Sequence, residues 1–218
     1  MEIRYLGLLT YSDALGIMES LHQEIVEKPK REGVLLVVQH PPTVTMGKRE
    51  LYDDMKIPPE QLKFKGIAFH KIDRGGSVTV HEPGQVVVYP IVHMDKLNKS
   101  VRIYVNLLEE AMISTAAQFG VSVTRDEINP GVWVGQNKIG AVGIRIANKV
   151  TKHGIAFNVT NSLETFSSIV PCGLRGRGVI NLQMAVDELS VSQNLPLARI
   201  DYLKVEKILA EEIHKLLN

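Results

Sequence analysis

One uninterrupted apolar segment gives the strongest constraint on the fold. Val34–Gln39 has the length and composition of a β-strand, and His40-Pro41-Pro42 stops it. Three later strand-like segments are separated by short turns, which predict antiparallel neighbours; these are Ala68–Ile72, Ser77–His81 and Gln85–Ile91. The other segments of strand character are Glu2–Leu9, Thr43–Met46, Val121–Thr124, Gly131–Val134, Lys138–Ala147 and Val150–Val159. A sheet therefore forms a large part of the fold.

Apolar residues at helical spacing predict three helices, at Ser12–Lys28, Val101–Phe119 and Asp201–Leu217. Gly47–Gly66 is polar and predicts a loop with one short helix after Pro58-Pro59, serving either as a lid or as a plain surface excursion. The sequence has no internal repeat and no linker-like stretch. We therefore predict an α/β (α+β) fold, with a mixed, largely antiparallel sheet and packed helices, in a single domain over residues 1–218.

Composition narrows the class of protein. Hydrophobic residues make up 44% of the 218 residues and the formal net charge is +1, which is typical of a globular enzyme and gives no reason to expect a nucleic-acid partner. No apolar run has the length of a membrane helix, and the first residues lack the apolar core of a signal peptide, so we expect a cytoplasmic protein without a membrane partner. Its one cysteine cannot form an internal disulfide.

The segment from Arg74-Gly75-Gly76 to Gln85 is the first candidate for chemistry. Adjacent glycines permit close approach of the backbone to a ligand, and Pro83-Gly84 suits the central positions of a type II turn, with His81 at a strand end. On this segment alone, an ordinary hairpin with a surface histidine is the favoured interpretation. Glu82 would hold the first turn position, which needs no special φ, so Glu82→Gly is expected to fold normally.

Lys138 and His153 are two further candidates. Lys138 begins an otherwise small and apolar strand, where a desolvated amine could act as a base, although an exposed lysine after a turn is the favoured interpretation. Strand alternation places His153 on the face shared by Thr151, Ile155 and Phe157 and favours a hydrogen-bonded core histidine. Zinc binding is less favoured still, because His40, His81, His153 and Cys172 have no closely spaced pair.

Cys172 lies in Pro171-Cys172-Gly173, with Arg175 and Arg177 shortly after it. Proline and glycine predict a turn. A thiol in a turn near cationic side chains has a stabilised thiolate and is a good nucleophile, so we favour a functional cysteine over a packed one.

In their order along the chain, these motifs resemble those of the lipoyl(octanoyl) transferase family. The resemblance spans most of the chain and rests on Arg74-Gly75-Gly76, His81-x-Pro83-Gly84-Gln85, the Lys138 strand, Thr151-x-His153-Gly154 with Asn158-Val159, and Pro171-Cys172-Gly173, with His40-Pro41-Pro42 and Thr45-x-Gly47 before them. Three departures concern the substrate pocket rather than the reaction: Val80 for an aromatic residue, Glu82 for glycine and Asn181 for serine.

The resemblance implies a fold similar to biotin and lipoate protein ligases. It implies octanoyl acyl carrier protein as donor, and as acceptor a lysine of the lipoyl domains of 2-oxo acid dehydrogenases or of the glycine cleavage H protein. Cys172 would carry the acyl group with Lys138 as its catalytic partner, and neither a cofactor, a metal nor ATP would be needed. The implied substrate-binding residues are Arg74, Gly75, Gly76, His81, Gly140, Ala141, Val142, His153, Gly154 and Ala156.

Two alternatives remain open from the sequence. An ATP-dependent lipoate or biotin ligase would also use a glycine-rich turn and a strand lysine, but it activates its acid as an adenylate and needs no thiol such as Cys172. A non-catalytic protein that binds carrier or lipoyl domains would keep the pocket without turnover.

Overall fold

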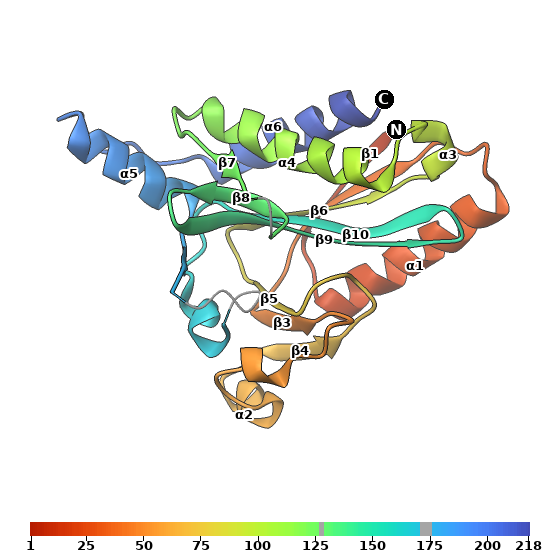
Figure 1. The fold of residues 1–218 in the computed structure, drawn as a ribbon, viewed down its shortest axis with the longest axis horizontal. Coiled ribbons are helices and arrows are strands. Elements are labelled where there is room, and N and C mark those ends of the chain that lie inside the picture. The colour runs from red at the N-terminus through yellow and green to blue at the C-terminus, as the bar shows by residue number, and fades with distance from the viewer. Residues whose placement is uncertain (127–128, 171–175) are drawn as a thin grey trace.

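A mixed sheet forms the centre of the protein (Figure 1). The computed structural model describes residues 1–126, 129–170 and 176–218. Across this sheet the strands follow the order β1 (Glu2–Leu8), β2 (Val34–Gln39), β6 (Gln85–Ile91), β10 (Val150–Asn158), β9 (Asn137–Ala147), β8 (Gly131–Val134) and β7 (Thr124–Arg125), and β11 (Gly178–Val179) pairs with β9. The β1–β2 and β9–β11 pairs are parallel and the other pairs are antiparallel. The predicted fold class is confirmed.

A second, smaller sheet has the order β4 (Ala68–Lys71), β3 (Thr43–Met46), β5 (Val78–His81). The prediction that residues 68–72, 77–81 and 85–91 form consecutive antiparallel neighbours is wrong, because β3 separates β4 from β5 and β6 belongs to the large sheet. The turn between β4 and β5 does not close a hairpin. Instead, the amide of Gly75 donates to the carbonyl of Ile144 in β9 at 2.9 Å, so the turn joins the two sheets.

Helices cover both faces of the large sheet. Figure 1 shows α4 (Val101–Ala117) and α6 (Tyr202–Leu217) on one face, and α1 (Tyr11–Glu27) with the small sheet on the other. These three helices and the short α2 (Pro59–Phe64) confirm the helical predictions. The sequence analysis missed α3 (Met94–Leu97), α5 (Leu182–Ser192) and the 3₁₀ helices at Tyr52–Asp54 and Glu164–Ser168.

Burial on both faces explains the apolar run in β2. Leu35 and Val37 belong to the core cluster that includes residues of α4 and α6, whereas Leu36 and Val38 belong to the cluster that includes residues of α1. Successive strand residues point to opposite faces, so the buried residues 34–38 must all be apolar when helices cover both faces. A third cluster, the small-sheet cluster, packs the small sheet, including Val80, against Leu62 of α2 and against Phe166 and Ile169.

The predicted turn at Pro83-Gly84 is confirmed. Gly84 has φ 89°, and the amide of Gln85 donates to the carbonyl of Glu82 at 3.2 Å. Steric packing also requires glycine at position 84, because a Cβ there would lie 2.6 Å from the backbone nitrogen of Asn161. The turn is therefore packed directly against the chain that leaves β10.

Glu82 departs from the expectation that glycine would replace it without effect. Its side chain is buried and accepts hydrogen bonds from the amides of Leu163 at 2.7 Å and Thr165 at 3.3 Å, and from the side-chain amide of Asn161 at 3.0 Å. Substitution by glycine would leave these donors without their acceptor, which is costly inside a protein. The earlier expectation considered only the backbone angle and not the contacts of the carboxylate, and from these contacts we now expect Glu82→Gly to be less stable than wild type.

The turn predicts a difference between two glycines of similar backbone conformation. Gly84→Ala and Gly120→Ala both place alanine at positive φ, which costs about 1–2 kcal/mol. Only at Gly84 would the new Cβ also meet backbone atoms, since Gly120 has φ 76° and open space around it. Urea denaturation should therefore give a clearly larger loss in the free energy of unfolding for Gly84→Ala. Equal losses for the two variants would contradict this account of the turn.

Candidate active site

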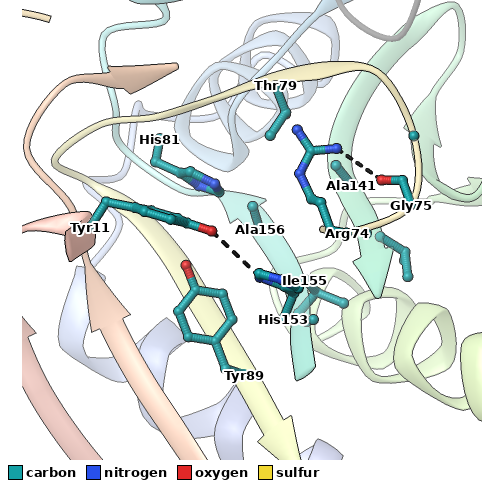
Figure 2. A pocket seen from close by; sticks show the side chains of 14 residues that line it. Tyr11, Arg74, Gly75, Thr79, His81, Tyr89, Ala141, His153, Ile155 and Ala156 are labelled. Carbon is teal, nitrogen blue, oxygen red and sulfur yellow. Dashed lines mark hydrogen bonds between the residues drawn. The ribbon is translucent and has the colours of Figure 1, made fainter. Parts of the chain in front are cut away.

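A cavity lies between β9 and β10 of the large sheet, β5 of the small sheet and the start of α1 (Figure 2). It encloses about 480 Å³ of empty space, counting the part open to solvent. The residues that line it are Tyr11, Arg74, Gly75, Gly76, Thr79, His81, Tyr89, Ala141, Val142, Gly143, His153, Gly154, Ile155 and Ala156.

Small residues on β9 and β10 make room for the cavity wall. A Cβ at Gly143 would lie 2.9 Å from Cδ of Arg74, so glycine lets the arginine side chain cross directly over β9. At Gly154, a Cβ would lie 2.1 Å from the carbonyl oxygen of Val88 in the neighbouring strand. Ala141 of β9 and Ala156 of β10 are paired in the register, and their short side chains leave space in the cavity above the sheet.

Arg74 fixes the Gly75-Gly76 turn. Its guanidinium is buried and donates from Nη2 to the carbonyl oxygen of Thr45 at 2.7 Å and to Oγ1 of the same residue at 2.9 Å. From Nη1 it donates to the carbonyl oxygen of Gly75 at 2.9 Å (Figure 2). This planar group with several donors thus ties β3 to the turn and builds the wall of the cavity.

At one end of the cavity, Tyr11, His153 and Asp73 form a hydrogen-bonded series. Nε2 of His153 lies 2.8 Å from Oδ1 of Asp73. On the other side of the ring, Nδ1 lies 3.4 Å from the hydroxyl of Tyr11, a contact marked by a dashed line in Figure 2. Burial would raise the pKa of Asp73, but hydrogen bonds from His153 and Lys152 outweigh it and lower this pKa to about 2. An ionised carboxylate only accepts, so Nε2 carries the proton and Tyr11 donates to Nδ1.

His153 does not lie on the face predicted for it. Its φ is 57°, and its amide donates to Sδ of Met18 in α1 at 3.1 Å. Lys152 contacts the same side, with Nζ 2.8 Å from Glu19 and 3.0 Å from Asp73. The left-handed backbone breaks the alternation, so that His153 faces α1 instead of sharing the face of Ile155 and Phe157, which belong to the α4 and α6 cluster.

Burial keeps the other histidines around Tyr11 neutral. It lowers the pKa of His40 to about 4, and it lowers the pKa of His81 well below the ordinary value. His40 donates from Nδ1 to the carbonyl of Leu9 at 2.8 Å, which leaves Nε2 to accept from the hydroxyl of Tyr89 at 2.9 Å. The rings form an uncharged aromatic and polar cluster.

Lys138 lines a second pocket that adjoins the first cavity, and the two together are called the groove below. Thr79, Ala141 and Ala156 line both parts, and the second part adds Gln85, Lys138, Gly140, Asn158, Phe166 and Val179. The lysine side chain is 5% exposed, in contrast to the exposed lysine favoured by the sequence alone. β11 pairs alongside it, which no local pattern predicted.

Two cations lie against one indole ring in this part of the site. Nζ of Lys138 donates to the carbonyl of Pro130 at 3.0 Å and lies 5.2 Å from the ring centroid of Trp133. Cζ of Arg177 lies 3.4 Å from the same centroid. The ring faces attract both cations and hold them in a mostly buried region, where positive charge favours an anionic group.

The structure brings most of the predicted binding residues together. Arg74, Gly75, Gly76, His81, Ala141, Val142, His153, Gly154 and Ala156 line the first cavity, and Gly140 and Lys138 line the adjoining part. Their roles toward a substrate stay predictions, and Cys172, with Pro171, Gly173 and Arg175, lies outside the described residues.

Sequence reasoning missed several residues of the site, including Gly143 and Ile155 of the first cavity. Tyr89 could have been noticed as a hydroxyl in an otherwise aliphatic strand, whereas Tyr11, Asp73 and Thr79 give no such signal. The sequence analysis expected three departures from the family pattern to affect the substrate pocket, but Val80, Glu82 and Asn181 do not line the first cavity. Val80 is buried in the small-sheet cluster, Glu82 holds the segment after β10, and Asn181 begins α5 by accepting from the amide of Met184 at 2.7 Å, as a serine could.

Comparison with known proteins agrees with this architecture. Residues 10–199 match the lipoyl protein ligase A/B catalytic domain, and the chain belongs to this family. It is 42% identical over 185 residues to an octanoyltransferase of Caldicellulosiruptor saccharolyticus, covering 84% of this chain and 78% of that protein.

Solved structures share the fold at low sequence identity. Lipoate-protein ligase A bound with ATP has a TM-score of 0.63 and 16% identity, covering 99% of this chain and 95% of that one. Biotin protein ligase from Leishmania major in complex with biotinyl-5-AMP has a TM-score of 0.58 and 12% identity, covering 99% and 73% respectively. The predicted likeness to the biotin and lipoate ligase fold is thereby confirmed.

The Asp73 network predicts an acid-sensitive contribution to stability. Because the pKa of Asp73 falls from the ordinary 3.8 to about 2 on folding, its stabilising effect is complete above about pH 5 and is lost as the pH falls towards 2. In urea denaturation, Asp73→Asn should be less stable than wild type at pH 7, and the difference should shrink between pH 4 and pH 2.5. Exposed Glu188 serves as a control, since Glu188→Gln should give a small difference throughout. A deficit for Asp73→Asn that is unchanged at pH 2.5 would contradict the assignment.

Proposed function

We propose that this protein transfers an octanoyl group from acyl carrier protein to a lysine of lipoyl domains, in the cytoplasm, with residues 1–218 acting as one catalytic domain. Membership of the lipoyl protein ligase A/B family and the likeness to an octanoyltransferase support an acyl-transfer reaction in lipoate biosynthesis. The observation that carries the proposal is a cavity with small and apolar sides that continues directly to a buried lysine. Within the described residues, no helix has both the length and the apolar character needed to cross a membrane.

The acyl chain would lie in the first cavity. Ala141, Val142 and Ala156 offer apolar contact along its sides, and the Gly75-Gly76 turn closes over it. Each buried methylene contributes about 0.8 kcal/mol to binding, so a chain of several methylenes is held firmly by this surface alone. The thioester end would then extend toward Lys138.

The proposed reaction has two acyl-transfer steps and needs neither an oxidant, a reductant nor ATP. The thiolate of Cys172 attacks the carbonyl carbon of the donor thioester, a new carbon–sulfur bond forms, and the thiol of the carrier leaves. The lysine amine of the acceptor then attacks the same carbon, an amide forms, and Cys172 leaves as thiolate. The amide is more stable than the thioester, so the second step draws the reaction forward.

Lys138 would assist both steps. As a cation, it stabilises the thiolate of Cys172; as a neutral amine, it accepts a proton from the thiol or from the incoming acceptor amine. The two groups would titrate as a coupled pair. Arg177, on the same indole ring, adds positive charge to this part of the site.

The donor and the acceptors follow from the family resemblance. Octanoyl acyl carrier protein would supply the chain, and the lipoyl domains of 2-oxo acid dehydrogenases and the glycine cleavage H protein would receive it. The ligases of similar fold instead have ATP or an adenylate in their solved structures. Cys172 distinguishes the two chemistries, because an adenylate route has no need of a thiol.

Acylation of the cysteine is the first test. Incubation with octanoyl acyl carrier protein should add one octanoyl group to the protein, visible by intact mass spectrometry and removed by hydroxylamine. Peptide mapping should place it on Cys172, and Cys172→Ala should carry none. An adduct that persists in Cys172→Ala, or adenylate formation from ATP and free octanoate, would overturn the proposed route.

Removal of the lysine is the second test. Lys138→Met keeps a similar unbranched length without the charge, so the pKa of the Cys172 thiol should rise toward about 8.5 and both acyl-transfer steps should slow. Higher pH should partly restore the first step. The readouts are iodoacetamide alkylation of Cys172 against pH and single-turnover transfer, with exposed Lys207→Met as the matched control. Coinciding curves for Lys138→Met and the control would remove Lys138 from the mechanism.

A further inference from the structure

The first cavity is largely apolar along β9 and β10, although Arg74, Thr79 and His81 also line it, and it has a polar end. Its walls beside β9 and β10 consist mainly of glycine, alanine and aliphatic side chains, whereas Tyr11, Tyr89 and His153 gather at one end (Figure 2). An alkyl chain gains nothing from contact with hydroxyl and imidazole groups that already satisfy one another. The end of the cavity therefore differs in chemistry from the surface along which a chain would bind.

This polar end lies far from Lys138. In the β9–β10 register, His153 is opposite Ile144, which is six residues beyond Lys138 on β9. Between these two positions, Ala141 and Ala156 line both parts of the groove. A chain whose thioester is near Lys138 would thus point its methyl group toward the tyrosines.

The ring of Tyr11 is held in place on several sides. It is the first residue of α1 and is 3% exposed. Its centroid lies 5.2 Å from that of His70 and 5.8 Å from that of His81, both in stacked orientation, and 5.2 Å from that of His40. A ring packed in this way cannot swing aside for a longer ligand without disturbing three neighbours.

The hydroxyl of Tyr11 is held as well. It donates to Nδ1 of His153, which donates from Nε2 to Asp73. Nζ of Lys152 lies 3.0 Å from Asp73 and 2.8 Å from Glu19. Glu19 is a residue of α1, the helix that begins with Tyr11. Displacement of the hydroxyl would leave a buried imidazole nitrogen without its donor, which is unfavourable.

We infer that the hydroxyl of Tyr11 is the stop that limits the length of the acyl chain, and that Tyr11 is a specificity-determining residue. This inference rests on the proposed function, because it assumes that the chain occupies this cavity. Octanoyl would end before the hydroxyl, and longer chains would have to displace it or remain partly outside. Asp73 and Lys152 are positioning residues that act through His153.

The test is a competition between donors of different length. Wild type, Tyr11→Phe and Tyr11→Leu are each incubated with an equimolar mixture of hexanoyl, octanoyl, decanoyl and dodecanoyl acyl carrier protein, and adducts are counted by intact mass spectrometry. Each additional buried methylene is worth about fourfold in binding. The dodecanoyl-to-octanoyl ratio should therefore rise about tenfold or more in Tyr11→Leu, and about fourfold in Tyr11→Phe, which makes room for roughly one more methylene.

A matched control separates length selection from loss of a buried hydroxyl in general. Tyr104 is fully buried in the α4 and α6 core, away from the cavity lining, so Tyr104→Phe should keep the wild-type distribution. Circular dichroism checks that each variant is folded. If Tyr11→Leu does not fold, the Tyr11→Phe ratios decide the question.

Each outcome has a definite meaning. A folded Tyr11 variant with an unchanged distribution, or with an equal loss for all lengths, overturns the inference and leaves the proposed function intact. A wild-type protein that already accepts dodecanoyl as well as octanoyl also overturns it. Absence of any adduct on folded wild type would instead defeat the proposed function, and with it the basis of the inference.

Discussion

The pairing of β10 with both of its neighbours is the interaction on which the rest of the structure depends. β10 pairs with β6 on one side and β9 on the other, and all of its residues from Val150 to Asn158 are buried. Its backbone supplies the floor of the cavity, and its two faces support different helices. β9 pairs with residues 150–157, whereas β6 pairs only with residues 155–158. His153, the left-handed residue of the strand, is therefore held by β9 on one side and by Met18 on the other, and it can project a side chain where regular alternation would not.

Buried charged and polar groups connect this strand to the second sheet. Arg74 joins the Gly75-Gly76 turn to β3, and Glu82 joins the next turn to the chain after β10. Both side chains satisfy backbone groups that would otherwise be buried without partners. The small sheet is therefore part of the site. The turn before β5 forms a wall of the cavity, and the turn after β5 holds the segment that leads on to Val170.

The two ends of the groove differ in their electrostatics. Near Lys138, cations are held against an indole ring, which suits a reaction that passes through anionic groups. Around Tyr11, burial lowers the pKa of the histidines and leaves a neutral cluster of rings. One groove thus combines an end with two cations against an indole ring and an end lined by neutral rings, behind which His153 is bonded to the ionised Asp73.

Sequence alone determined the class of fold, most helices and strands, and the glycine-rich motifs, because periodicity and turn chemistry are encoded within a few neighbouring residues. Only the tertiary structure decided that β3 separates β4 from β5, that Glu82 binds a segment 81 residues away, and that Tyr11 meets His153 across 142 residues. Such contacts depend on how distant segments pack, and no local pattern contains them. His153 shows the limit most clearly: its alternation pattern was correct for a regular strand, but packing against Met18 and Asp73 selected a backbone angle that reverses its face.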